Sequence, residues 1–434
     1  MQPIRIGILG MGTVGGGTAK LLSENAQEIT RRLGREVRIS MAASHNTDRI
    51  RKLCPSDTVV SDDVFQVARS ADVDIVVELI GGTDTAREVV LCAIENGKHV
   101  VTANKKLLAE YGNEIFARAA EKNVMVMFEA AVAGGIPIIK ALREGLAANR
   151  IKSVVGIING TSNFILSNMR EHGSPFAEVL KQAQELGYAE ADPTFDIEGH
   201  DAAHKLSIMS ALAFGTPINF QHCYLEGISK LESQDIRYAE ELGYRIKLLG
   251  ITRQTSEGIE LRVHPTLVPE CRLLAQVEGV MNAVLVQSNM VGETLYYGAG
   301  AGAAPTASAV VADIIDTARL MHAASEQRVP PLAFRRNEQL PVLPIDEITS
   351  SYYLRVSAQD KPGVVADIGR ILAEQGISIE ALLQKGVINH ENAEIVILTH
   401  QAKEKHIKAA IAQIEALEHV FEPVMMLRME SLHG

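Results

Sequence analysis

The stretch Ile4–Leu9 (IRIGIL), followed by Gly10–Gly15 (GMGTVG), decides the first part of the fold. A short apolar run that ends in Gly-x-Gly-x-x-Gly and leads into a helical pattern predicts a strand, a tight turn and a helix. The first glycine permits the turn, the second lets a pyrophosphate approach the backbone, and the third permits close packing of helix and strand. The stretch therefore predicts a dinucleotide site at a helix N-terminus. The predicted contacts are Gly10, Gly12, Thr13, Val14 and Gly15.

Apolar runs and helical patterns then alternate along the first third of the chain. The predicted strands are Val37–Ala43, Asp74–Leu79, His99–Thr102 and Val124–Phe128, and helical stretches between them include Thr85–Asn96 and Leu107–Lys122. Strands that alternate with helices are typical of a parallel, doubly wound α/β sheet. We therefore predict a Rossmann-type nucleotide domain.

The residues after the second predicted strand bear on the choice of cofactor. NAD enzymes usually place an acid there, on the ribose hydroxyls. This chain has Ala-Ala-Ser-His-Asn, which includes Ser44, with Arg49 nearby and no acid. The missing acid favours NADP(H), and NAD(H) stays possible because Ser44 and His45 suit either nucleotide.

Two further signals follow later strands, at the sheet edge where open α/β sheets bind ligands. The loop Glu78–Thr83 (ELIGGT) has a backbone that can approach the ribose and nicotinamide, which makes Thr83 a cofactor contact. Past the next strand lies a lysine pair, Lys105 and Lys106. We assign Lys105 to the site and Lys106 to the solvated surface.

Composition limits the class of protein. At 434 residues the chain is long enough for two or three domains. Its net charge of -11 and lack of clustered basic residues argue against nucleic-acid binding. The N-terminus lacks a signal-peptide pattern, and no apolar run is long enough for a membrane span. We expect a cytoplasmic protein without membrane or nucleic-acid partners.

The stretch Leu186–Lys205 (LGYAEADPTFDIEGHDAAHK) concentrates five carboxylates and a lysine before an apolar helix. Asp201 and Lys205 are four residues apart on a predicted helix, so they share one face. Taken alone, the pair fits either a surface ion pair or an active site.

Several blocks of the sequence closely resemble the homoserine dehydrogenase family. The blocks, in that family's order, are GMGTVG, TANKK, EAAVAGGIPII, GIINGTSNFIL and LGYAEADPTFDIEGHDAAHKL. The resemblance covers Ile4 to about Leu320. It implies reversible, NAD(P)-dependent interconversion of aspartate semialdehyde and homoserine.

The resemblance also implies roles for single residues. Lys205 would be the acid/base that protonates the carbonyl oxygen. Lys105 would hold the same end of the substrate beside the nicotinamide, and so would also be a cofactor contact. Glu190 would bind the substrate amine, with Asp201 assisting and Asp196 behind them. This suits a substrate whose ammonium needs carboxylates and whose developing oxyanion needs a proton donor.

Further contacts follow from the resemblance. Gly187 and Gly302 would lie at the cofactor, the latter in a glycine-rich loop, Gly298–Thr306, before a long helix. A monovalent cation, Na⁺, would be held by carboxylate and carbonyl oxygens, which suit a hard ion. Its predicted ligands are Glu129, Val132, Gly134 and Ile136. The residues alone indicate only a glycine-rich turn there.

Two alternatives of other classes stay open on the sequence. His200-Asp201-Ala202-Ala203-His204 superficially matches the zinc motif H-E-x-x-H, although the acid is Asp and no third ligand stands out downstream. A zinc hydrolase would use this pair. The other alternative is a non-catalytic, amino-acid-sensing protein with an inactive dehydrogenase body.

The last third predicts a regulatory module after a proline-rich linker. Strand, helix, strand, strand, helix and strand follow one another in about 80 residues, which is ferredoxin-like. With Asp360-Lys361-Pro362-Gly363 at the first turn, this part resembles the ACT domain. The implied effector is threonine; the alternative is a dimerisation module without a ligand.

These patterns predict the following organisation. The nucleotide domain spans 1–134, the substrate and dimerisation domain 135–304, the linker 326–349 and the ACT domain 350–434, with helix 305–325 returning to the nucleotide domain. We expect a homodimer or homotetramer.

Overall fold

The computed structural model describes residues 2–385 and 392–432 and divides into two compact units. Unit 1 comprises Met1–Gly160, Asp201–His222 and Val280–Leu340. Unit 2 comprises Thr161–His200, Cys223–Gly279 and Pro341–Gly434. In the described part of the chain, no helix is both long and apolar enough to cross a bilayer.

Unit 1 is built on a parallel six-stranded sheet with the order β3-β2-β1-β4-β5-β6. Its strands are β1 (Ile4–Leu9), β2 (Val37–Ala43), β3 (Val59–Ser61), β4 (Ile75–Glu78), β5 (His99–Thr102) and β6 (Val126–Met127). The central strands are buried on both faces, as in other parallel sheets covered by helices. The predicted doubly wound nucleotide fold is therefore confirmed.

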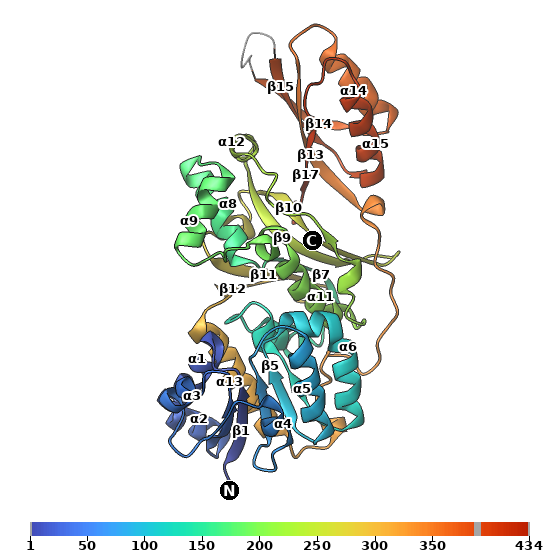
Figure 1. Ribbon diagram of the computed structural model, residues 1–434. Coiled ribbons are helices and arrows are strands. Elements are labelled where there is room, and N and C mark those ends of the chain that lie inside the picture. The colour runs from blue at the N-terminus through green and yellow to red at the C-terminus, as the bar shows by residue number, and fades with distance from the viewer. Residues whose placement is uncertain (1, 386–391, 433–434) are drawn as a thin grey trace. The chain divides into compact units, whose positions relative to one another are not determined.

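Helices cover both faces of this sheet (Figure 1). One face carries α1 (Thr13–Glu24), α2 (Ala26–Leu33), α3 (Thr47–Leu53) and α13 (Ala303–Leu320). The other face carries α4 (Val64–Arg69), α5 (Asp84–Glu95) and α6 (Lys105–Glu121). Helix α13 is far away in the sequence but packs along α1, and Val310 and Ile314 enter the same core as Ile6 and Ile8.

The rest of unit 1 holds an antiparallel sheet and several short turns. The sheet has the order β12-β11-β7, with β7 (Ile151–Ile157), β11 (Met281–Ser288) and β12 (Glu293–Ala299). The short elements are a 3-10 turn (Glu129–Ala131), α7 (Ile138–Lys140), a π-helical turn (Ala141–Gly145) and 3-10 turns Phe220–His222 and Ser325–Gln327. Helix α11 (His200–Phe214) carries the predicted Asp201 and Lys205 on a buried helix.

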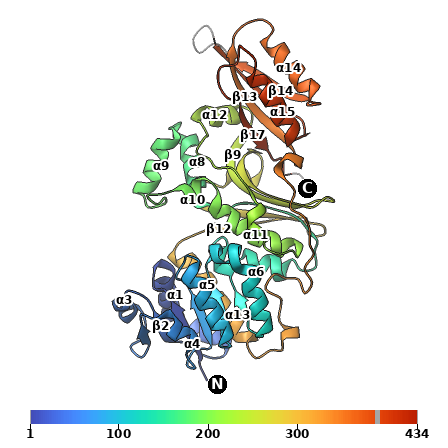
Figure 2. The same ribbon diagram turned by 45° about the vertical axis from the view of Figure 1, so that its right-hand side comes forward.

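Unit 2 contains the following elements. They are α8 (Gly160–His172), α9 (Phe176–Glu185), α10 (Thr194–Ile197), β8 (Tyr224–Leu225), α12 (Ser233–Glu241), β9 (Tyr244–Gln254), β10 (Ile259–Pro269), 3-10 turns Leu273–Gln276 and Ile345–Glu347, β13 (Thr349–Gln359), α14 (Val364–Glu374), β14 (Ile379–Lys385), β15 (Asn392–Thr399), β16 (Ala402–Lys403), α15 (Glu404–Glu415) and β17 (Met425–Met429). The elements from β13 onward follow the predicted ferredoxin-like order, with α14 and α15 on one face of the sheet (Figure 2).

This C-terminal module shares a sheet with the rest of unit 2. Its last strand, β17, pairs in parallel with β10 through Thr266 and Arg428. Buried ion pairs reinforce the junction: Arg428 lies 2.7 Å from Glu226, and Arg355 lies 2.7 Å from Asp235 on α12. A chain that ended near Leu343 would lose β17 and leave Asp235 buried without its partner, so truncation is a poor test of regulation.

Candidate active site

The glycine turn after β1 has the geometry of a phosphate-binding loop. Gly10 has a φ of 88°, and a Cβ there would lie 2.6 Å from the Leu79 carbonyl oxygen. A Cβ on Gly15 would lie 2.0 Å from the Gly10 carbonyl oxygen, whereas one on Gly12 would meet no described atom within 4 Å. The space at Gly12 lies at the N-terminus of α1, whose first turn contains Thr13 and Val14. The turn thus offers backbone amides and a helix dipole to an anion.

Gly17, which lies outside the Gly-x-Gly-x-x-Gly motif, explains how α13 can pack next to the glycine turn. A Cβ on Gly17 would lie 2.8 Å from the Ala303 carbonyl oxygen, so α1 and the start of α13 pack backbone to backbone. Gly302, the predicted cofactor contact, immediately precedes α13 with a φ of 117°. Its loop belongs to the same unit as the glycine turn.

The end of β2 brings a cation to the glycine turn. Arg49 on α3 donates from Nη2 to the Gly12 carbonyl oxygen at 3.2 Å. Asn46 fixes the start of α3 because its Oδ1 accepts from the Arg49 backbone N–H at 3.1 Å. Ser44 lies at the end of β2 and donates from its backbone N–H to Ser61. Arg49 is therefore a basic side chain that contacts the glycine turn from the helix after β2, close to the strand end where NAD enzymes usually place an acid.

A buried carboxylate shapes the loop after β4. Glu78 accepts hydrogen bonds from the backbone N–H groups of Ile80 at 2.9 Å and Gly81 at 3.3 Å, and from the Thr102 hydroxyl at 2.6 Å. Burial raises the pKa of Glu78, and these donors oppose the rise. Thr83 follows this loop and directly precedes α5. The sequence indicates Glu78 only as part of a loop, whereas the structure shows that its carboxylate holds that loop in place.

Lys105 stands at the first position of α6, just past β5. Asn104 caps this helix, since its Oδ1 accepts from the Leu107 backbone N–H at 3.1 Å. The Lys105 ammonium lies 2.8 Å from Asp201 Oδ1, although the two residues are far apart in the sequence. Lys106, the next residue, pairs with Glu110 at 3.9 Å on the exposed side of the helix.

Asp201 connects the two predicted catalytic lysines. Its Oδ2 accepts from Lys205 Nζ at 2.6 Å and from Asn159 Nδ2 at 2.9 Å. Lys205 also donates to the carbonyl oxygen of Ile158 at 2.7 Å, and both Ile158 and Asn159 directly follow β7. Burial alone would raise the pKa of Asp201, but the charges of the two lysines outweigh it and hold the pKa below its usual range.

The two histidines of the zinc motif have aromatic neighbours. The His204 ring packs on Phe220 with 4.2 Å between ring centroids, and His200 stacks on Phe195 at 6.3 Å. Among the residues that the structure describes, no group of three His, Cys, Asp or Glu side chains is arranged to hold a metal ion.

Comparison with known proteins identifies the family. Family models match in three places: "Homoserine dehydrogenase, NAD binding domain" over residues 10–129, "Homoserine dehydrogenase" over 137–315 and "ACT domain" over 352–419. A homoserine dehydrogenase from Neisseria gonorrhoeae is 70% identical over 100% of both chains, and one from Bacillus subtilis is 39% identical over 99% of both. The chain belongs to the homoserine dehydrogenase family.

Solved structures of homoserine dehydrogenases have the same fold as this chain. The crystal structure of the enzyme from Thiobacillus denitrificans has a TM-score of 0.95 and 60% identity, over 100% of this chain and 99% of that one. A hyperthermophilic archaeal homoserine dehydrogenase in complex with NADPH has a TM-score of 0.63 and 28% identity, over 73% of this chain and 98% of that one. The protein is thus an NAD(P)-dependent oxidoreductase with an ACT domain, as predicted, and the zinc hydrolase and the non-catalytic sensor are wrong.

Three predicted residues of this dehydrogenase lie in unit 2. Gly187 has a φ of 76°, Glu190 is exposed and its carbonyl oxygen accepts from Gln184 at 3.1 Å, and Asp196 lies on α10 with its carbonyl oxygen accepting from Ser162. Lys105, Asp201 and Lys205 belong to unit 1. The predicted roles of these unit 2 residues therefore stay predictions.

The predicted cation loop of the dehydrogenase is tightly bonded. The Glu129 carboxylate accepts from the backbone N–H groups of Ile139 at 2.9 Å and Lys140 at 2.8 Å. Burial raises its pKa to about 7. Ala133 and Gly134 have φ values of 55° and 51°, so the loop turns through two left-handed residues. The structure thus shows a buried carboxylate and a left-handed turn in this loop, and the sodium site stays a prediction.

Proposed function

We propose that the protein reduces L-aspartate 4-semialdehyde to L-homoserine, reversibly, with NADP(H) preferred over NAD(H). When the nucleotide is bound, it supplies a hydride to the carbonyl carbon of the substrate. The observation that carries the proposal is the Lys105–Asp201–Lys205 arrangement, which lies just past β5 at the carboxyl edge of the nucleotide sheet. Ligands of open α/β sheets bind at that edge.

Lys205 is the proton donor in this proposal. Negative charge develops on the carbonyl oxygen as the carbon is reduced, and a nearby ammonium both stabilises that charge and gives up its proton to form the alcohol. The Asp201 carboxylate, at 2.6 Å from Lys205 Nζ, favours the charged ammonium form before reaction. Lys105 is held by the same carboxylate and binds the same end of the substrate.

Carboxylates bind the substrate ammonium at the other end. Glu190 is the main ligand, with Asp201 assisting and Asp196 supporting the site. Both Asp201 oxygens already face lysine ammonium groups, whereas the Glu190 side chain is exposed and can bind an amine through charge-assisted hydrogen bonds. This division supports Glu190 as the stronger amine ligand.

NADP(H) preference rests on Arg49. A guanidinium on α3, the helix that follows β2, suits a 2′-phosphate, and its contact with the Gly12 carbonyl oxygen holds it at the nucleotide turn. The archaeal relative solved with NADPH agrees with this choice. The other proposed cofactor contacts are Gly10, Gly12, Thr13, Val14, Gly15, Ser44, Thr83, Lys105, Gly187 and Gly302.

Na⁺ is the proposed cation at Glu129, Val132, Gly134 and Ile136. It would stabilise the left-handed loop through carbonyl oxygens, with one carboxylate oxygen completing the set. Replacing Na⁺ with tetramethylammonium at constant ionic strength should lower turnover at least threefold. Equal rates in the two salts would contradict a functional cation.

Threonine is the proposed effector of the ACT domain. A cavity of 360 Å³ lies at the turn Asp360–Gly363, where Gly363 has a φ of 102° and α14 begins. Backbone amides at a helix N-terminus suit an amino-acid carboxylate. We expect L-threonine to inhibit turnover, and Asp360→Ala to weaken inhibition at least tenfold, while Asp367→Ala on α14 leaves it unchanged. Intact enzyme that ignores threonine would contradict the regulatory role.

We further place the enzyme in the cytoplasm, as a homodimer or homotetramer that serves threonine, methionine and isoleucine biosynthesis. The decisive assay for the activity follows NADPH absorbance with aspartate semialdehyde as substrate. Oxidation that depends on the semialdehyde supports the proposal, and none with either nucleotide would refute it.

A further inference from the structure

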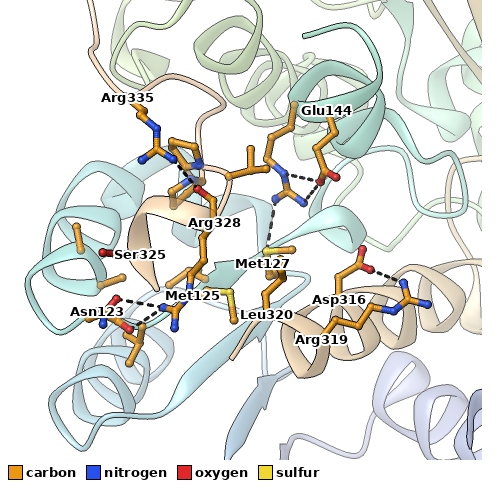
Figure 3. Close-up of a pocket in the computed structure, with 18 of the residues that line it drawn as sticks. Asn123, Met125, Met127, Glu144, Asp316, Arg319, Leu320, Ser325, Arg328 and Arg335 are labelled. Atoms are coloured by element: carbon orange, nitrogen blue, oxygen red, sulfur yellow. Dashed lines mark hydrogen bonds and ion pairs between the residues drawn. The ribbon is translucent and has the colours of Figure 1, made fainter. Parts of the chain in front are cut away.

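Unit 1 contains a cavity of 420 Å³ that the dehydrogenase chemistry does not use (Figure 3). Its walls are the end of α6, strand β6, the π-helical turn, the last turns of α13 and the segment from Ser325 to Arg335. Asn123 and Met125, which line it, precede β6, whereas the glycine turn follows β1. In a parallel sheet these positions lie at opposite edges, so the cavity is separate from the nucleotide turn.

The cavity combines basic and apolar walls. Its lining includes five basic side chains and two acidic ones, although the chain as a whole carries a net charge of -11. The basic residues are Lys140, Arg143, Arg319, Arg328 and Arg335, and the acidic ones are Glu144 and Asp316. Apolar side chains, among them Met125, Met127 and Leu320, line the remainder. Such a lining favours an anion with an apolar body.

Arg143 is the buried charge in this cavity. Its side chain is 3% exposed, and its Nε and Nη2 share a single oxygen of Glu144 at 3.3 and 3.0 Å. Its Nη1 donates to the Met127 sulfur at 3.5 Å, and a thioether is a weak acceptor. A buried guanidinium needs strong acceptors to offset its desolvation. Arg143 therefore has capacity for a second oxyanion.

The backbone around Arg143 is unusual as well. The Leu146 N–H donates to the Ala141 carbonyl oxygen five residues back at 2.8 Å, which defines a π-helical turn. Such turns are rare and often occur at functional sites, because the inserted residue redirects side chains. Here the turn places Arg143 and Glu144 in the cavity wall.

An unsatisfied donor lies on the cavity wall formed by the segment from Ser325 to Arg335 (Figure 3). Arg328 binds the Asn123 carbonyl oxygen through Nη1 at 2.9 Å and the Met321 carbonyl oxygen through Nη2 at 3.1 Å. Its Nε is buried and has no hydrogen-bond partner within the described chain. Arg335 packs alongside, since its Nη2 donates to the Arg328 carbonyl oxygen at 3.2 Å.

We propose that this cavity binds a small organic monocarboxylate with an apolar body. Arg143 anchors the carboxylate, and Met125, Met127 and Leu320 contact the body. The volume lies within the range of about 300–1,000 Å³ that small-molecule sites occupy. A dianion such as inorganic phosphate would leave the apolar walls without contacts, so a carboxylate with a hydrocarbon tail fits better.

Binding is tested on the full chain with matched probes. Hexanoate and 4-phenylbutanoate are titrated beside their neutral amides, with isothermal calorimetry for affinity and methyl NMR of ¹³C-methionine-labelled protein for location. We expect saturable binding of the carboxylates, at least tenfold tighter than the amides, with shifts of the Met125 and Met127 methyls but not of exposed Met290. Saturating NADPH should change the affinity less than twofold.

Three variants decide whether this cavity is the site. Leu320→Trp fills the apolar part and Arg143→Gln removes the anchor, and each should weaken carboxylate binding at least tenfold. Arg38→Gln, an exposed arginine paired with Asp57 elsewhere in unit 1, is the matched control and should change binding less than twofold. The proposal would be overturned if binding did not saturate, if the acid and its amide bound equally well, or if Leu320→Trp bound the carboxylate as tightly as wild type. The cavity would then be only a gap in the packing. Leu320→Trp keeps the test valid if Arg143→Gln fails to fold.

Discussion

The Asp201 carboxylate lies between two ammonium groups: Lys105 Nζ is 2.8 Å from Oδ1 and Lys205 Nζ is 2.6 Å from Oδ2. Without Asp201 the two lysines would repel one another in a partly buried site, and each would lose its position. A buried carboxylate with two cations is also unusual enough to need a reason, because its desolvation is costly. The proposed role of both lysines at one substrate oxygen would supply that reason.

Asp201→Asn should therefore impair chemistry more than nucleotide binding. We expect kcat for semialdehyde reduction to fall by about 10²–10⁴-fold, the range for loss of general acid catalysis, with the NADPH dissociation constant within twofold of wild type. Glu110→Gln, which neutralises the surface partner of Lys106 on the same helix as Lys105, is the control. A kcat for Asp201→Asn within threefold of wild type would show that the bridge is structural.

Arg49→Ala should change nucleotide preference. Removing a cation from the 2′-phosphate position costs about 1.5–3 kcal/mol for a charged hydrogen bond, so we expect the KM for NADPH to rise at least tenfold and that for NADH to change less than twofold. Arg51→Ala, on the same helix but paired with Asp48, should leave both unchanged. Equal increases for the two nucleotides would argue against a phosphate contact.

The glycine turn permits a paired test of fold against function. Gly12→Ala adds a Cβ into open space, so the protein should keep its melting temperature while NADPH affinity falls, because the methyl group occupies the phosphate's approach. Gly15→Ala should lower both, since its Cβ would lie 2.0 Å from the Gly10 carbonyl oxygen. Differential scanning fluorimetry and NADPH titration measure the two effects. Unchanged NADPH affinity in Gly12→Ala would remove the second glycine from the site.

We expect the folded protein to lose stability in acid, because it contains a buried histidine, His99. Burial, together with the charges of Arg328 and His322, lowers the pKa of His99 from 6.5 to about 4. Its Nδ1 accepts from the Met125 N–H at 3.0 Å, which a proton on that atom would prevent. The histidine binds a proton more readily in the unfolded chain than in the folded one. The free energy of unfolding is therefore highest above pH 6.5 and falls by about 3 kcal/mol as the pH drops from 6.5 to 4.

Urea unfolding at a series of pH values checks this sign. His99→Gln should lack the loss between pH 6.5 and 4 that wild type shows, while His172→Gln, on the surface of unit 2, should keep it. Parallel pH curves for wild type and His99→Gln would contradict a neutral, buried His99.

Much of the fold could be predicted because its strands are apolar runs bounded by clear signals. The strands β2 and β5 have the predicted ends. Elements with few buried residues were missed: β3 has three residues, α2 buries only Ile29, and no residue of β12 is fully buried. The helix after the second glycine loop begins at Ala303, two residues before its predicted start at 305, because Pro305 is tolerated in a first turn.

In the candidate site, too, local contacts could be predicted from the sequence and contacts between distant segments could not. The spacing of Asp201 and Lys205 indicated that they share a helix face, and they form an ion pair. The contacts of Asp201 with Lys105 and Asn159 depend on how β5, β7 and α11 meet, which local pattern does not encode. The hydrogen bond from Arg49 to Gly12 and the arginine-lined cavity likewise join distant segments.

The central claim is that Lys205 delivers the proton to the substrate oxygen. The most direct measurement is single-turnover oxidation of bound NADPH by aspartate semialdehyde in wild type and Lys205→Ala. The rate of the variant should fall at least 10²-fold while its NADPH dissociation constant stays within twofold of wild type. A rate near that of wild type would contradict this assignment.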